Sequence, residues 1–382
     1  MKFTRLVFPG IAMIASSYGL ARFSYGLLLP DINESLAMTE FASGVVSALF
    51  YLSYCFMIVI STVLTTRDGP RVMILAAGAL AVVGMAIMSA APSVWLLALG
   101  VLFAGGSTGL VSPPYGAAIS LWIRRKDQGR ANTWINSGTS IGIVLTGLGA
   151  ILLTPHWRLT YLIYTVIALI VLYWSYRTIP KSEPDVYFDK GQLSLRGADT
   201  PGPLVVSSLV MGISSAAFWT FSRSFIETAG TYTNVQSSGF WIMIGLFGMV
   251  GGISGGFIEK AGLQRAFMTG GLSLSAASII LAVFPEIIWS SYLAAALFGA
   301  SYIFLTGVIL VWGIRVFYSN ASLGIAIPFL LLAVGQVAGS PLAGGLIAFA
   351  GYKTAFLLFG LIGIAGSLVP TKERPQQYSE TP

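Results

Sequence analysis

Residues 72–90, VMILAAGALAVVGMAIMSA, form an apolar run without a charged side chain. An α-helix needs about 20 such residues to cross the ~30 Å hydrocarbon core of a bilayer. Over all 382 residues, 55% are apolar and 9% are charged, with a mean hydropathy of +0.82. A soluble domain carries roughly a quarter charged residues. We therefore predict that lipid surrounds much of this protein.

Similar runs recur along the whole chain, and none shows the two-residue alternation of a barrel strand. We predict an all-α membrane protein with twelve transmembrane helices. Lys2 and Arg5 before the first run also fit a signal peptide, but no small-residue cleavage site follows, so we expect a retained helix. The predicted spans are 6–29, 41–65, 72–90, 94–122, 131–154, 158–178, 204–226, 236–258, 265–284, 288–314, 322–350 and 352–370.

Basic residues fall almost entirely on one side of this topology. Arg158 and Lys353 lie on the other side, and Arg22 and Arg223 lie within spans. Because cytoplasmic loops carry the excess of Lys and Arg, we predict a multi-pass protein of the cytoplasmic membrane with both termini cytoplasmic. The net charge of +7 then needs no nucleic-acid partner. The residues on the basic side are Lys2, Arg5, Arg67, Arg71, Arg124, Arg125, Lys126, Arg130, Arg177, Lys181, Lys190, Arg196, Lys260, Arg265, Arg315, Lys372 and Arg374.

One long polar segment, 179–203, is rich in Pro, Gly and charge and is predicted to be a cytoplasmic linker. It separates an N-terminal six-helix bundle (1–178) from a C-terminal one (204–371), with a cytoplasmic tail at 372–382. The halves echo each other at an offset of about 193 to 197 residues. Gly69 corresponds to Gly262, the segment 157–164 to 352–359, and the glycines at 138 and 142 to those at 335 and 339. The shared offset predicts two six-helix pseudo-repeats, a known transporter design with the substrate site between them.

The loops after the second span of each half carry a common pattern of glycine and charge. It is similar to the Gly-x-x-x-Asp-Arg-x-Gly-Arg-Arg signature of the major facilitator superfamily, which the chain resembles over nearly its whole length. Residues 19–30 look like the bacterial YbfB/YjiJ-like branch. The resemblance implies the major facilitator fold, a transporter, a monomer, and gating by the two loops. The first copy has Thr66 where the acid belongs, which puts its gating contact in doubt. The matching positions are Arg67, Gly69, Arg71, Gly255, Glu259, Lys260 and Gly262.

Several functional classes find no support in the sequence. Cys55 is the single cysteine and His156 the single histidine, so neither a disulfide nor a His-based metal site is expected. No Walker motif, Gly-rich phosphate loop or nucleophile elbow is present. We therefore expect no cofactor, no metal and no enzymatic activity.

Arg22 is the most informative residue. It lies about eight residues before Pro30, hence ~12 Å below the outer end of its helix, too deep for easy snorkelling. A buried guanidinium must face water, a partner or the bundle interior. Tyr18, Arg22 and Tyr25 share one helical face by their spacing. We expect that face to line the central cavity.

All fourteen Asp and Glu residues fall in loops, tails or span ends. Arg22 therefore lacks an acidic partner. Its planar guanidinium group can donate two parallel hydrogen bonds to a carboxylate or phosphate. This favours an organic anion as substrate, although a purely structural Arg22 is the alternative. No deep proton relay is visible, so exchange of anions, facilitated diffusion or proton entry with the substrate stay open.

Other cavity candidates are polar and aromatic residues near the middle of the spans. The family places its cavity mainly between helices one, four, seven and ten. Arg223 and Glu227 are expected to pair with each other at i, i+4. The remaining candidates are Tyr54, Tyr115, Asn136, Ser140, Trp219, Tyr302 and Gln336.

The sequence thus favours a secondary active or facilitative transporter of a small organic anion that works by alternating access. Efflux of neutral or cationic compounds is the alternative, supported by the many aromatic residues. A receptor that binds without transporting is a third.

Overall fold

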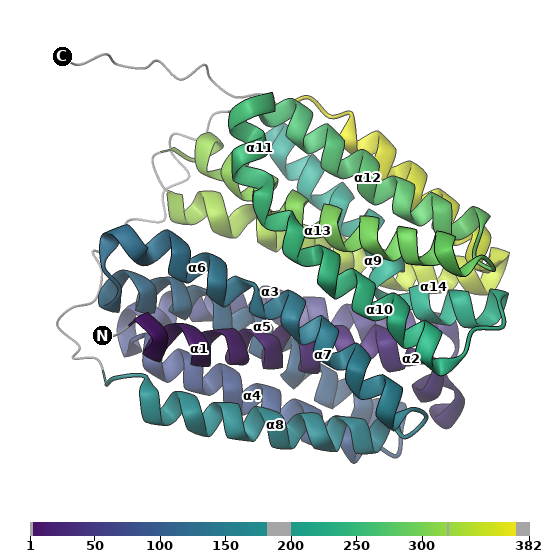
Figure 1. Cartoon of the computed structure of the whole chain (residues 1–382), viewed down its shortest axis with the longest axis horizontal. Coiled ribbons are helices and arrows are strands. Elements are labelled where there is room, and N and C mark those ends of the chain that lie inside the picture. The colour runs from purple at the N-terminus through teal and green to yellow at the C-terminus, as the bar shows by residue number, and fades with distance from the viewer. Residues whose placement is uncertain (1–2, 182–199, 319–320, 372–382) are drawn as a thin grey trace.

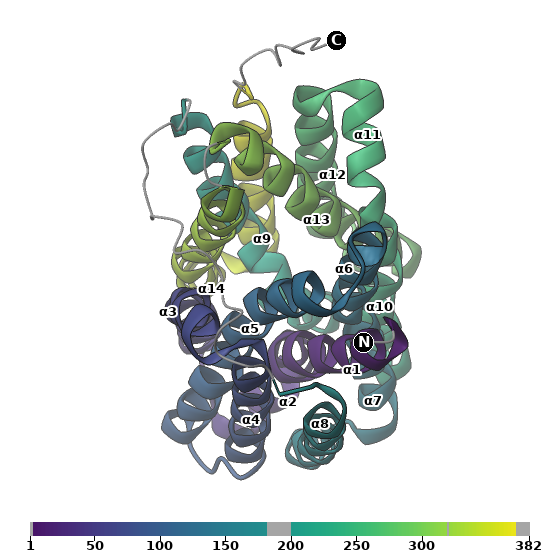
Figure 2. The same ribbon diagram turned by 90° about the vertical axis from the view of Figure 1, so that its left-hand side faces the viewer.

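The computed structural model describes residues 3–181, 200–318 and 321–371, and every element within them is helical. The predicted tail at 372–382 and most of the predicted linker at 179–203 lie outside these residues. Figures 1 and 2 show two stacked groups of helices, residues up to 178 on one side and residues from 202 on the other.

The first half contains every span predicted for it. Its first span has three parts, α1, a π-helical segment η1 and α2, which follow one another without a break. A 3₁₀ turn, η2, precedes the fifth span, which is formed by α6 and α7. The bounds are α1 Phe3–Ile14, η1 Ala15–Phe23, α2 Ser24–Leu36, α3 Glu40–Asp68, α4 Pro70–Ser89, α5 Val94–Trp122, η2 Arg125–Asp127, α6 Gln128–Asn136, α7 Gly138–Leu153 and α8 Trp157–Thr178.

The second half contains the remaining helices. A 3₁₀ segment, η4, interrupts its second span, which comprises α10, η4 and α11. The bounds are α9 Gly202–Ala229, α10 Asn234–Gly248, η4 Met249–Ile253, α11 Ser254–Ala261, α12 Leu263–Val283, α13 Ile288–Val316 and α14 Ala321–Ser367.

Within the described residues, 11 helices are long and apolar enough to cross a membrane, one fewer than predicted. The difference lies in α14, where the predicted spans 322–350 and 352–370 form one segment of 45 residues, Leu323–Ser367. At 1.5 Å per residue this segment would be about 68 Å long, more than twice the hydrocarbon core. Gly351 interrupts it with a non-helical backbone, φ 80° and ψ 168°.

Two glycines that the repeat aligns have the same unusual backbone. Gly69 has φ 85° and ψ 159°, and Gly262 has φ 84° and ψ 161°. Each ends one helix and immediately begins the next. Only glycine adopts this region without strain, which explains why both loops carry it.

Glycines at four-residue spacing bring helices into backbone contact in both halves. A methyl group added at Gly142 would lie 2.6 Å from the carbonyl oxygen of Ala15 in the first span. At Gly335 it would lie 2.2 Å from the carbonyl oxygen of Leu209 in α9. Such contacts drive helix association in lipid, where apolar burial gives no advantage.

The two halves meet along α3 with α14 and along α7 with α10, as Figure 2 shows. Here too glycines allow close approach. A methyl group at Gly44 would lie 2.3 Å from the carbonyl oxygen of Ser340, and one at Gly344 would lie 2.2 Å from that of Glu40. These contacts lie near the end of the bundle that carries the 37–39 and 230–233 connections. We call this boundary between the halves the seam.

Candidate functional site

The first span is π-helical around Arg22, from Ala15 to Phe23. A π-helix turns more slowly than an α-helix, so the segment re-aims the side chains that follow, and such segments are frequent at functional sites. Gly19 in its middle lies against α7, where an added methyl group would come within 2.4 Å of the Gly142 backbone. The close contact with α7 fixes this wide turn in place and directs Arg22 to the seam.

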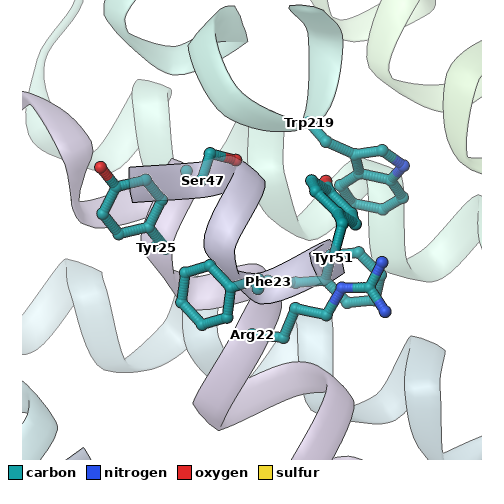
Figure 3. Close-up of a pocket in the computed structure, with 8 residues that line it drawn as sticks. Arg22, Phe23, Tyr25, Ser47, Tyr51 and Trp219 are labelled. Atoms are coloured by element: carbon teal, nitrogen blue, oxygen red, sulfur yellow. The ribbon is translucent and has the colours of Figure 1, made fainter. Parts of the chain in front are cut away.

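Arg22 is only 7% exposed and is surrounded by aromatic rings. Its guanidinium carbon lies 4.5 Å from the ring centre of Tyr51, 5.2 Å from those of Tyr54 and Phe23, and 5.9 Å from that of Tyr18. Figure 3 shows the guanidinium beside Tyr51. The π faces are negative, so they stabilise the cation without neutralising it.

One neutral side chain from the other half also contacts Arg22. Its Nη2 donates a hydrogen bond to Oε1 of Gln336, at 3.3 Å. Nε2 of Gln336 donates to the hydroxyls of Tyr302, at 3.1 Å, and Ser215, at 3.3 Å. The Nε of Arg22 is buried without a hydrogen-bond partner in the described structure. Among the described residues the guanidinium thus has no ion-pair partner, and its Nε–H donates to no acceptor.

An aromatic wall from the second half faces Arg22. Trp219 in α9 stacks on Phe23 with a centroid distance of 4.2 Å and an interplanar angle of 28°. Tyr302 and Phe298 each pack against Trp219 in an edge-to-face arrangement, with a distance of 5.1 Å between ring centroids. The Phe23–Trp219 pair therefore joins the halves directly over the charged site (Figure 3).

A small cavity lies between these groups, with a volume of about 10 Å³. A single water needs roughly that much room, whereas ligand pockets measure about 300–1,000 Å³. This cavity cannot hold an organic solute in the conformation described. It is lined by Arg22, Phe23, Tyr25, Gly26, Ser47, Phe50, Tyr51 and Trp219.

The structure brings several of the predicted site residues together. Tyr18 lies beside Arg22 and shares a hydrogen bond of 2.9 Å with Ser112 of α5. Tyr25 lines the cavity, but its hydroxyl donates to the carbonyl oxygen of Ser43, and Figure 3 shows its ring directed away from Arg22. The predicted residues gathered around the guanidinium are Tyr18, Arg22, Tyr54, Trp219, Tyr302 and Gln336.

Three predicted residues lie elsewhere. Tyr115 packs in a separate apolar cluster with Ile135 and other residues of α1, α5 and α6. Asn136 is exposed and donates to Asn132 in its own helix. Ser140 is buried on the seam and lies close to Gly248 of α10. A methyl group added at Gly248 would lie 2.9 Å from its Oγ.

Sequence reasoning missed Tyr51, the nearest ring to the Arg22 cation, as well as Phe23. Ser47, Tyr51 and Tyr54 follow one another at i, i+4 and i+7, so one polar and aromatic face of α3 was readable in the sequence. Phe23 was not readable, because an α-helical wheel places it off the Tyr18–Arg22 face. The π-helical turn changes that placement.

The predicted gating residues lie at loop ends. Arg67 is 78% exposed and pairs with its neighbour Asp68 at 3.4 Å. Arg71 donates to the carbonyl oxygen of Tyr176, at 2.9 Å, and so ties α4 to α8 within the first half. Glu259 and Lys260 are exposed, and a methyl group at Gly255 would meet open space. A gating role for these residues stays a prediction.

The predicted pair of Arg223 and Glu227 is confirmed, with Nε 2.7 Å from Oε1. The sequence did not indicate that Arg223 is 1% exposed and also reaches across the seam. Its Nη1 donates to the carbonyl oxygen of Leu27 in α2.

Comparison with known proteins identifies the family. The profile of the Major Facilitator Superfamily matches residues 11–326. The chain belongs to the Major Facilitator Superfamily. The match runs from the first span into α14 and includes every residue of the Arg22 cluster except Gln336. The chain is therefore a multi-pass membrane protein of a transporter family.

One curated relative is the protein of Pseudomonas aeruginosa described as transcription regulatory protein OpdE. It is 26% identical over 369 residues, covering 91% of this chain and 88% of the relative. Despite its name, OpdE aligns along nearly the whole membrane domain.

Solved structures of this superfamily share the fold at low identity. The nucleoside transporter NupG has a TM-score of 0.77 at 12% identity, over 95% of this chain and 98% of that one. A POT family transporter in complex with 5-aminolevulinic acid has a TM-score of 0.80 at 12% identity, over 96% of this chain and 94% of that one. A D-xylose-proton symporter has a TM-score of 0.75 at 16% identity, over 97% of this chain and 98% of that one.

Proposed function

We propose that this superfamily member carries a small organic anion across the cytoplasmic membrane, by secondary active or facilitative transport, with Arg22 as the anion-binding residue. The observation that carries the proposal is the environment of Arg22. The guanidinium is 7% exposed, lies at the seam, and contacts aromatic faces and an amide oxygen. A cation at a midplane seam with a free Nε is suited to bind a carboxylate.

The architecture behind this proposal has twelve spans in two six-helix repeats. Gly351 has nearly the same backbone as Gly69 and Gly262, each of which separates two helices. Because of this similarity we treat α14 as two spans, and the chain is proposed to reverse direction between them at Gly351. The site then lies between the repeats, as in other transporters of parallel-repeat design.

The cavity of about 10 Å³ supports alternating access, because a solute can enter only when the halves separate. We propose that the end with the 37–39 and 230–233 connections faces outside and is shut here. The opposite end carries the basic loops and, with both termini, faces the cytoplasm. The protein is proposed to act as a monomer, without a cofactor.

Binding of three matched probes tests the charge preference. Benzoate, benzamide and benzylamine share one ring and differ in charge. Ligand that binds only the folded state stabilises it by about 2.7 kcal/mol at a hundredfold excess over Kd. We expect benzoate, and neither of the others, to raise the melting temperature of purified protein, and expect Arg22→Gln to lose the response.

Two variants serve as controls. Arg22→Lys keeps the charge but not the planar fork and should respond weakly. Lys353→Gln removes an exposed outer cation and should respond like wild type. Stabilisation by benzylamine or benzamide alone, or an unchanged response in folded Arg22→Gln, would overturn the anion proposal and favour efflux of neutral or cationic compounds.

The description of the relative OpdE as a transcription regulatory protein favours a second candidate function. In that case the protein would be a membrane receptor that binds a solute and regulates transcription. Flux separates the two. A transporter reconstituted in sealed vesicles exchanges labelled benzoate with an internal pool faster than protein-free vesicles do, whereas a receptor binds benzoate without adding to that passive leak.

A further inference from the structure

The seam contains a second charged site, within the last two helical turns of α9. Arg223 donates to Oε1 of Glu227 in its own helix, to the carbonyl oxygen of Leu27 in α2, and to Oδ1 of Asn234 in α10 at 3.2 Å. Nδ2 of Asn234 in turn donates to the carbonyl oxygen of Ala150 in α7, at 3.2 Å. This network therefore fastens both halves to each other at the shut end.

A second carboxylate, that of Asp31 in the first half, lies within electrostatic range of the same guanidinium, although among the described residues Arg223 forms an ion pair only with Glu227. Asp31 lies one turn beyond Leu27 on α2, and its Oδ2 is buried without a hydrogen-bond partner in the described part of the chain. The charged groups that act on Asp31 are Arg223, Glu227 and Glu34. Arg223 also acts electrostatically on Tyr164 of α8, whose hydroxyl donates to the carbonyl oxygen of Thr146. Glu34 itself is exposed and stays hydrated.

The charges of this cluster do not balance. Asp31 and Glu227 supply two negative charges and Arg223 one positive charge, so a single negative charge is left at the closed seam. Asp31 is half-buried, with its Oδ2 fully shielded, and an unpaired charge that is partly removed from water costs free energy. Uptake of one proton by the two carboxylates removes that cost and leaves Arg223 paired. The side chain of Glu227 is 25% exposed, which gives the proton a route from water.

We propose that Asp31, Arg223 and Glu227 form a proton-binding site that couples the closure of the outer seam to the uptake of one proton. The closed seam binds the proton, and separation of the halves hydrates Asp31 and releases it outside. Low pH therefore favours the closed seam and high pH the open one. The inference deepens the proposed function, because it supplies the coupling ion that the middle of the membrane does not provide for.

The distance between the halves at their outer ends measures this coupling. Trp95 at the start of α5 and Trp289 at the start of α13 are 86% and 78% exposed. Cysteines at these two positions, with Cys55→Ser, carry spin labels on opposite halves for a pulsed dipolar measurement. One linked proton changes the closed-to-open ratio by up to about tenfold per pH unit. We expect short distances at pH 5 and a growing long-distance population towards pH 9.

Asp31→Asn and Glu227→Gln each leave one carboxylate for Arg223, so both variants balance their charge without a proton. We expect both to keep the short distance from pH 5 to pH 9. Glu34→Gln, the matched control, should follow pH like the parent. Size-exclusion profiles establish folding, and each variant tests the proposal if the other misfolds.

The inference is overturned if the parent distances do not change with pH, if folded Asp31→Asn and Glu227→Gln keep the pH response, or if Glu34→Gln abolishes it. None of these results bears on the binding of benzoate at Arg22. A pH-dependent seam without benzoate binding would leave this inference standing and remove the anion proposal.

Discussion

Arg22 and Gln336, separated by 314 residues, are joined by a hydrogen bond of 3.3 Å across the boundary between the two halves. The amide of Gln336 is fully buried and also bonds Tyr302 and Ser215, so its orientation is fixed. It is a neutral acceptor at the place where a carboxylate would cancel the charge of Arg22.

This relationship predicts that Gln336→Glu weakens anion binding at least tenfold. The new carboxylate would take the guanidinium as an ion pair and compete with any anionic solute. We expect the variant to fold and to melt at or above the wild-type temperature, while losing at least tenfold in affinity for benzoate by isothermal titration. Gln336→Met, which adds no charge, is the control. Affinity retained in Gln336→Glu would show that the anion binds elsewhere.

Tyr51 is predicted to hold the Arg22 cation through its ring, whose centre lies 4.5 Å away. A desolvated cation–π contact contributes about 0.5–2 kcal/mol. Tyr51→Leu should therefore lower the free energy of unfolding by that amount, and Tyr51→Phe should cost less, because the ring remains. Reversible denaturation in mixed micelles measures both. Equal losses in the two variants would assign the effect to the hydroxyl.

Gly19 is predicted to be intolerant of any side chain. A methyl group there would lie 2.4 Å from the Gly142 backbone, so Gly19→Ala must push the first span away from α7 and disturb the π-helical turn. We expect a loss of about 1–3 kcal/mol, measured as a lower melting temperature. Gly116→Ala, with open space around it, should be neutral or slightly stabilising. A neutral Gly19→Ala would mean that the contact is not tight.

Substitution of Gly262 tests backbone strain rather than side-chain packing. No atom lies within 4 Å of a methyl group added there, but the φ of 84° strains any other residue. Gly262→Ala should cost about 1–3 kcal/mol, and Gly69→Ala the same, because the two glycines share one conformation. Gly255→Ala, equally open but helical, is the control for the melting measurements. A harmless Gly262→Ala would show that another backbone is accessible at this loop.

Much of the fold was predictable because a bilayer imposes simple constraints. Run length predicted the positions of the spans. The number of spans was harder. A change of direction at Gly351 requires only one residue with positive φ, and the sequence gives no separate loop there.

The site was predicted in part. Depth and missing carboxylates indicated Arg22, and midplane polarity indicated Gln336, because both signals depend on energetic cost in lipid. Tyr51 and Phe23 were missed since an aromatic residue costs little anywhere in a membrane helix. The cluster at Arg223 was read as a local i, i+4 pair, and its contact with Leu27 from the other half has no sequence signal.

The cavity of about 10 Å³ beside Arg22 also bears on how affinity should be read. If the shut conformation predominates at rest, only the minor fraction of molecules with separated halves is competent to bind. The apparent dissociation constant is then the intrinsic one divided by that fraction. A modest measured affinity would be compatible with strong contacts at Arg22, and a substitution that loosens the Phe23–Trp219 stack could tighten binding without touching the solute.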